Sequence, residues 1–259
     1  MLDMINISSL PIFLLVLVRV VSFFVTLPLF SYRTIPNQFK IGFSVFLTFI
    51  MFYTIDPAGV DIEGIYIFLL LKEVVVGLLI GLIAYIIISA VQIAGGFVDF
   101  QMGFAIANVI DPQTGAQSPL TGQYFYIIAL LFLLSVNGHH LLIDGIFYSY
   151  ELIPIDTFIP FHNEGIVNFI VEAFNKMFLI AFQMAIPIVG CLFLVDVALG
   201  IIARSVPQLN VFVVGLPIKI FVSFVVIFFF LSLYLVLVRT LFTTMFETMR
   251  GLMQLFGGA

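Results

Sequence analysis

The chain has 259 residues, of which 63% are hydrophobic and only 9% are charged, and its formal net charge is −5. Soluble domains contain about 45–50% apolar and about 25% charged residues, and a chain of 28.9 kDa has too little interior to hide so much apolar surface from water. The composition excludes a soluble globular enzyme, a disordered protein and a binder of nucleic acid. It predicts an all-α, polytopic helical protein that contacts membrane lipid.

Six apolar segments approach the length of about 20 residues that a helix needs to cross a bilayer. They cover residues 10–30, 39–55, 65–98, 124–143, 178–195 and 211–238. The third would be about 51 Å long as one helix, so we expect it to tilt, break or project beyond the bilayer. Its Gly77-x-x-x-Gly81 spacing is compatible with a close helix contact, although glycines are common in membrane helices anyway. Pro217 favours a kink in the last segment.

Two stretches lie outside these segments and differ in character. Residues 144–176 form the longest polar stretch, with turns expected at Pro154 and Pro160. Residues 240–256 have apolar side chains at spacings of three and four, which predicts an amphipathic helix. That helix is open to two interpretations, one in which it lies in the membrane interface and one in which it docks on a partner.

Charged residues interrupt the apolar segments, although each costs about 2.5–3.5 kcal/mol at a helix centre. Acids and bases occur in similar numbers, which favours pairing between helices over an ion or proton relay. Adjacent residues on a helix point about 100° apart, so we expect Lys72 and Glu73 to have separate partners. An unpaired buried charge costs several kcal/mol, and we therefore expect the chain to be unstable alone. The interrupting residues are Arg19, Lys72, Glu73, Asp99, Lys176, Asp196, Arg204 and Lys219.

Signatures of catalysis and of cofactor binding are missing from the sequence. Cys191 is the single cysteine, which excludes a disulfide framework. His140 and Asp144 share a helix face, but His139 points elsewhere and no third metal ligand is evident. The motifs of serine hydrolases, zinc peptidases and phosphate-binding loops do not occur. We expect no enzyme, no metal and no cofactor.

The most informative stretch is the loop of residues 99–122, which joins two apolar segments. It is too polar to face lipid and too apolar for a free linker, and irregular backbone at membrane depth persists only where protein buries it or where it lines a cavity. The residues alone leave two interpretations open, a pore loop or plug and a folded loop packed on helix ends. The candidate residues of this loop are Gln101, Met102, Gly103, Phe104, Ile106, Asn108, Ile110, Asp111, Pro112, Gly115 and Pro119.

The sequence Asp99-Phe-Gln-Met-Gly-Phe104, with Asn108, Asp111-Pro112, Gly115 and Pro119 after it, resembles the FliR/SctT family of flagellar and type III secretion export-gate subunits. Further matching pieces occur in the family's order over essentially the full length. The arrangement looks like the separate flagellar subunit and not like a fusion to another export component. The further pieces are Pro28, Pro36, Lys40, Lys72-Glu73, Gly77, Gly81, Asn137-Gly138-His139, Pro187, Gly200 to Arg204, Pro207 to Phe212, Gly215, Pro217 and Lys219.

The resemblance implies a multi-pass protein of the bacterial cell membrane, located in the flagellar basal body, with one export-gate domain over residues 1–259. Family members assemble with FliP and FliQ, FlhB wraps around that assembly, FlhA supplies the export platform, and unfolded flagellar subunits pass through. By position, the family's plug corresponds to residues 99–119. The buried charges, among them Lys72, Glu73, Asp99, Asp196, Arg204 and Lys219, would then lie between helices of the assembly.

A small-molecule or ion carrier is the alternative function. Many carriers contain inverted repeats with broken helices at matching positions in their two halves. The halves of this sequence look unrelated, which favours the export gate.

Overall fold

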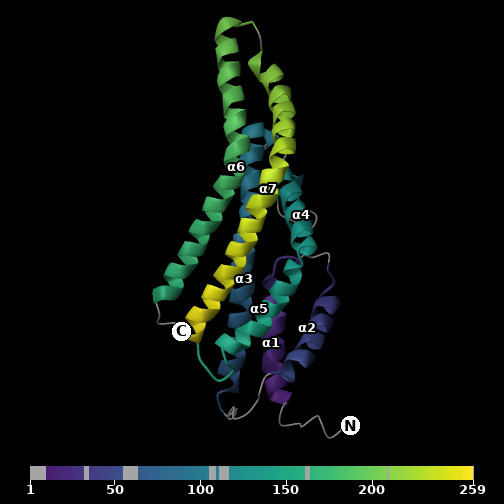
Figure 1. The fold of residues 1–259 in the computed structure, drawn as a ribbon, viewed down its shortest axis with the longest axis vertical. Coiled ribbons are helices and arrows are strands. Elements are labelled where there is room, and N and C mark those ends of the chain that lie inside the picture. The colour runs from purple at the N-terminus through teal and green to yellow at the C-terminus, as the bar shows by residue number, and fades with distance from the viewer. Residues whose placement is uncertain are drawn as a thin grey trace. The chain divides into compact units, whose positions relative to one another are not determined.

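The computed structural model describes residues 10–31, 35–54, 64–104, 109–110, 117–160, 164–208 and 210–258. Apart from one pair of two-residue strands, the regular structure in these ranges is helical, which confirms the all-α prediction (Figure 1). The elements are α1 (Leu10–Thr26), α2 (Asn37–Phe52), α3 (Tyr66–Met102), β1 (Val109–Ile110), β2 (Gln117–Ser118), α4 (Leu120–Ser135), α5 (Gly138–Leu152), α6 (Glu164–Ser205) and α7 (Val211–Gly257).

The chain divides into two compact units, and α3, α6 and α7 each contribute to both. Unit 1 consists of Met1–Ile87, Asn137–Phe174 and Thr244–Ala259. Unit 2 consists of Ile88–Val136 and Asn175–Thr243. Each unit therefore combines segments that are far apart in the sequence.

Fewer helices than expected are long enough to cross a membrane. Among the described residues, α3, α6 and α7 meet the requirement of length and apolarity, and α4 and α5 meet it only as a pair that is bent by 74°. α1 and α2 have 17 and 16 residues. Of the six apolar segments expected to approach the length of a crossing, three meet the requirement in the described part of the chain, or four with the bent pair.

The break between α4 and α5 was not predicted, since residues 124–143 read as one continuous segment. Asn137 adopts φ 57°, in the left-handed region, and Gly138 begins the next helix. Asparagine tolerates this conformation better than most residues because its short side chain hydrogen-bonds locally. Most of the polar stretch 144–176 is also helical, in the second half of α5 and the start of α6.

The predicted tail helix is the end of α7 and not a separate element. In unit 1, a Cβ on Gly251 would touch the Phe169 ring, and one on Gly257 would meet the backbone of Leu152. Because the chain itself covers the apolar face of the tail, this face neither lies in the membrane interface nor docks on a partner. The buried residues of that face are Leu241, Met245, Met249, Leu252 and Phe256.

Within each unit, helices approach closely enough for their backbones to touch. In unit 1, a Cβ on Gly77 would overlap the backbone and the Ser22 side chain of α1, and one on Gly81 would lie 2.8 Å from the Phe23 carbonyl oxygen. The predicted close contact at the two glycines is thus confirmed. In unit 2, Gly95 of α3 meets the backbone of Gly122 of α4 in the same way.

Candidate functional site

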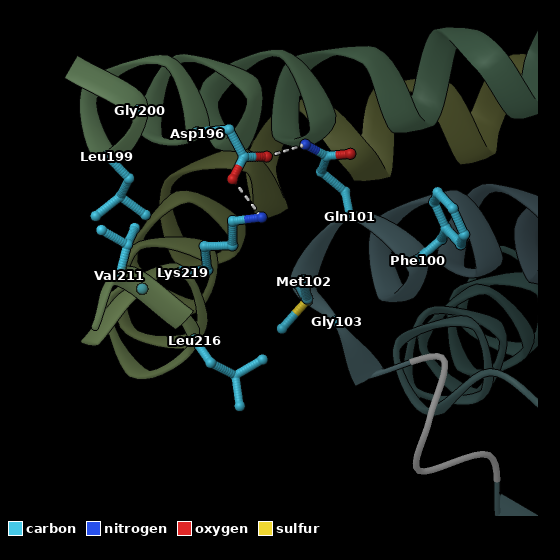
Figure 2. A pocket seen from close by; sticks show the side chains of 11 residues that line it. Phe100, Gln101, Met102, Gly103, Asp196, Leu199, Gly200, Val211, Leu216 and Lys219 are labelled. Atoms are coloured by element: carbon cyan, nitrogen blue, oxygen red, sulfur yellow. Dashed lines mark hydrogen bonds and ion pairs between the residues drawn. The ribbon is translucent and has the colours of Figure 1, made fainter. Parts of the chain in front are cut away.

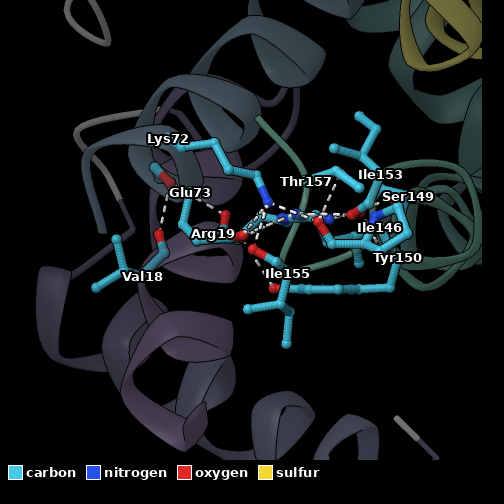
Figure 3. Close-up of polar contacts among 12 residues, drawn as sticks. Val18, Arg19, Lys72, Glu73, Ile146, Ser149, Tyr150, Ile153, Ile155 and Thr157 are labelled. Atoms are coloured by element: carbon cyan, nitrogen blue, oxygen red, sulfur yellow. Dashed lines mark hydrogen bonds and ion pairs between the residues drawn. The ribbon is translucent and has the colours of Figure 1, made fainter. Parts of the chain in front are cut away.

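Arg19 of α1 and Glu73 of α3 form a fully buried ion pair in unit 1, with both side chains 0% exposed (Figure 3). Arg19 Nη2 donates to Glu73 Oε1 at 2.9 Å and Nε donates to Oε2, so the pair is bidentate. The other guanidinium N–H groups reach α5 and the residue after it. Nη1 donates to the backbone oxygen and the Oγ of Ser149, both at 3.2 Å, and Nη2 donates to the carbonyl of Ile153 at 3.0 Å. All five donors of the guanidinium group have acceptors.

Lys72 belongs to the same network. Its Nζ lies 2.9 Å from Glu73 Oε1 and donates to the carbonyl oxygens of Pro154 at 2.6 Å and Ile155 at 3.0 Å. Glu73 thus has a separate partner in Arg19, as expected, but the expectation that Lys72 and Glu73 do not pair with each other is wrong. Although their Cα–Cβ bonds diverge, the four-carbon stem of lysine is long enough to bring its ammonium group back to the neighbouring carboxylate.

The network of Arg19, Lys72 and Glu73 contains two cations and one anion, and carbonyl groups at the end of α5 and just after it compensate for the extra positive charge. The last carbonyl groups of a helix have no partner within the helix and carry partial negative charge. Tyr150 adds two contacts, since its ring lies 3.8 Å from Arg19 Cζ and its hydroxyl donates to Glu73 Oε2 at 3.4 Å. The charges are thus satisfied within the chain, which removes the reason we gave for its instability in isolation.

A second ion pair lies in unit 2, between Asp196 of α6 and Lys219 of α7 (Figure 2). Gln101 Nε2 donates to Asp196 Oδ2 at 2.8 Å. The Asp196 and Lys219 side chains are 36% and 22% exposed, and they border a cavity of about 420 Å³ that Leu199 and Leu216 also line. These two charges also pair with each other inside the chain.

Arg204 does not occupy the buried position that we expected. It is exposed in the last turn of α6. A cation there interacts favourably with the negative end of the helix dipole, so a partner is not needed to explain its position.

Asp99, near the end of α3, connects the two ends of the α3–α4 loop. Its side chain is buried, and both carboxylate oxygens lie 3.2 Å from the backbone nitrogen of Thr121, whose hydroxyl also donates to Oδ1. Thr121 lies in the first turn of α4, where the N-cap residue Pro119 provides no side-chain cap. Asp99 therefore accepts from an amide that the start of the helix leaves unpaired. The contact joins two helices of one chain and not two subunits.

The structure describes only part of the candidate loop. Gly103 ends α3 with φ 88°, and Met102 before it is buried. β1 and β2 pair antiparallel, with Val109 opposite Ser118. Gln101 contacts Asp196, Phe104 lines a cavity of about 470 Å³ that Phe228 also borders, and Pro119 occupies the N-cap position of α4 without capping it. Ile110 is described only as part of β1, and Ile106, Asn108, Asp111, Pro112 and Gly115 lie outside the described residues.

The possible metal site gains no support. Within the described ranges, no three His, Cys, Asp or Glu side chains are grouped in a way that would hold an ion. The His139 and His140 rings lie beside each other, with centroids 4.1 Å apart.

Long apolar helices, buried ion pairs and a bent helix pair define the class of this molecule as a multi-pass helical membrane protein. The family described as "Bacterial export proteins, family 1" matches residues 10–245. The chain is 58% identical to "Flagellar biosynthetic protein FliR" of Bacillus subtilis over 249 residues, which cover 95% of this chain and 96% of that protein. It is 27% identical to the Escherichia coli protein of the same name, over 80% of this chain and 79% of that protein.

A relative from another secretion system is also similar. "Yop proteins translocation protein T" of Yersinia pestis is 34% identical over 161 residues, which cover 62% of each chain. The chain belongs to the FliR/SctT family of bacterial export proteins.

Proposed function

We infer that this chain is a subunit of the flagellar type III protein export apparatus in the basal body, and we propose that it forms part of the channel for unfolded flagellar subunits. The observation that carries this proposal is the 58% identity to the Bacillus subtilis FliR protein over 95% of the chain. The comparisons do not support the alternative of a small-molecule or ion carrier. We propose a structural role without catalysis or a cofactor.

The exposed faces of α6 and α7 favour assembly with other subunits. In the most apolar stretch of α3, 61% is buried within the chain, whereas in the corresponding stretches of α6 and α7 only 22% is buried. Exposed large apolar residues of α6 extend from Val167 to Ile202, a length of about 50 Å along the helix. Since the hydrocarbon core is about 30 Å thick, a bilayer crossed without steep tilt covers only part of this length. We propose that FliP and FliQ cover the rest, with FlhB and FlhA as further partners.

We propose that the loop of residues 99–119 closes the channel. Apolar side chains in such a loop, including Phe104, would exclude water from a narrow passage. Met102 was expected to contribute to this seal, but it is buried at the end of α3 and would first have to be uncovered. Unfolded chains would displace the loop during export, and its contacts would be numerous and individually weak.

Deletion of residues 106–116 tests this proposal. We expect the assembly to form while ion leakage across the membrane rises and growth slows. Replacing the same residues by a Gly-Ser segment of equal length is the matched control, because it keeps the connection and removes the apolar side chains, and it should leak as well. If both membranes stay tight while export stops, the loop serves transport and does not close the channel.

A further inference from the structure

The base of the α3–α4 loop contains a buried carboxylate, Asp99, whose hydrogen bonds go to Thr121 and Leu120 at the start of α4, on the other side of the loop. Asp99 is 2% exposed, and its hydrogen bonds to Thr121 come from the backbone amide and the hydroxyl of that residue. The two residues are far enough apart in sequence to enclose the whole loop between them. In the described part of the chain, amide and hydroxyl groups donate to this carboxylate, and these donors and the positive end of α4 balance its charge.

The start of α4 depends on this contact. An N-cap is normally Ser, Thr, Asp or Asn, whose side chain accepts from the first free amides, but here the position is occupied by Pro119, which has no such acceptor. Asp99 supplies the acceptor from a different helix. The cap of α4 and the attachment of α4 to α3 are therefore one and the same interaction.

Packing around the carboxylate leaves little room for adjustment. Gly95, one turn before Asp99, faces the backbone of Gly122, where any Cβ would overlap. A Cβ on Gly122 would in turn come within 2.8 Å of the Gln92 carbonyl oxygen and 2.7 Å of the Pro119 ring. α3 and α4 thus meet backbone to backbone beside Asp99.

We propose that Asp99 is a positioning residue that locks the base of the α3–α4 loop through the N-terminus of α4 and so keeps the two ends of the loop together. The effect on leakage rests on the proposed closing role of the loop, whereas the effect on the geometry of the base does not. Replacing the carboxylate by a neutral amide keeps one acceptor oxygen but removes the charge, which weakens the hydrogen bonds by about 1 kcal/mol and corresponds to about a fivefold increase in the ratio of open to closed base.

The test is Asp99→Asn in the assembled export complex, with two readouts. The first is the distance between spin labels at Phe100→Cys and Tyr124→Cys, positions that are exposed on α3 and α4, in a background where exposed Cys191 is replaced by Ser. The second is ion leakage. We expect a broader and longer distance distribution and increased leakage, with complex yield unchanged. Asp144→Asn, which removes an exposed carboxylate on α5, is the matched control and should change neither readout.

A second variant separates capping from the lock between helices. Asp99→Asn combined with Pro119→Ser gives α4 its own cap, and Pro119→Ser alone controls for loss of the ring. We expect the double variant to keep the altered distance, because the bond between α3 and α4 is still weakened. If it returns both readouts to those of Pro119→Ser, Asp99 only caps α4 and the proposal is overturned.

The two proposals fail in different ways. An unchanged distance in Asp99→Asn overturns the lock, whatever the loop does. A changed distance with a tight membrane, in cells where deletion of residues 106–116 is also tight, supports the lock and overturns the closing role of the loop.

Discussion

Replacing Glu73 by Gln is the most severe test of the buried network in unit 1. The substitution removes the carboxylate to which both Arg19 and Lys72 bond, and it leaves two cations close together in a site that excludes water. Removing one partner from a buried ion pair costs about 3–5 kcal/mol. We expect a loss of stability of that size, because the remaining carbonyl acceptors carry only partial charges.

Lys72→Met serves as the internal comparison. It removes the extra cation and keeps the Arg19–Glu73 pair, while the carbonyl oxygens of Pro154 and Ile155 lose a donor. An unsatisfied group of this kind costs about 1–3 kcal/mol. Glu73→Gln should therefore be the more destabilising variant by about 2 kcal/mol.

Pulse proteolysis of the purified export complex across a series of SDS concentrations measures these differences, with this chain detected through an epitope tag. Glu151→Gln, which changes an exposed carboxylate on α5, should stay within about 0.5 kcal/mol of wild type. The reasoning is refuted if Lys72→Met destabilises the chain as much as Glu73→Gln does, or if Glu73→Gln behaves like Glu151→Gln.

Three further predictions concern backbone contacts and the second ion pair. Gly77→Leu should abolish recovery of intact complex by co-purification, because the leucine side chain would force α1 and α3 apart. Gly42→Leu should not, because a Cβ at Gly42 meets no atom within 4 Å. Equal yields of the two variants would contradict the close contact. Asn137→Val should destabilise the chain by about 1–2 kcal/mol through its left-handed backbone, while Asn137→Gly should have little effect, and proteolysis that ranks them the other way would disprove this. Asp196→Lys should lower complex yield, because it places two lysines side by side. Its combination with Lys219→Asp restores an opposite pair and should recover part of the yield. A double variant with no higher yield than Asp196→Lys would show that the pair is unimportant.

The helical class of the protein and the positions of most helices could be predicted from the sequence, because a long apolar segment in a membrane protein forms a helix in nearly every case. Residues 65–98 were expected in one segment, and α3 spans Tyr66–Met102. The positions at which one helix ends and the next begins were less predictable. Asn137-Gly138 is a recognisable turn signal, yet it was outweighed by the apolar residues on either side. The tail is continuous with the preceding helical segment, because Arg239 and Thr240 interrupt the apolar run without ending the helix.

Pairing of the charged residues could not be predicted to the same degree. Arg19 and Glu73 are separated by 54 positions, and Ser149 and Ile153 are 130 and 134 positions from Arg19, so only the folded chain brings them together. In the sequence, the presence of an arginine in an apolar run indicated that this residue has a charged partner, but not which one. The expectation that Lys72 and Glu73 diverge was based on backbone geometry and ignored the reach of a lysine side chain.

The central claim is that unfolded flagellar subunits pass through a channel to which this chain contributes its α3–α4 loop. The most direct test places a photo-crosslinking amino acid at Phe104, in complexes where an export substrate is stalled by a folded domain at its end. The same amino acid at Phe46, an exposed position on α2, is the control. The account predicts a crosslink between the stalled substrate and residue 104 that disappears when the substrate is released, and little crosslinking at residue 46. A substrate that stalls in the complex and reacts at neither position, or equally at both, would contradict it.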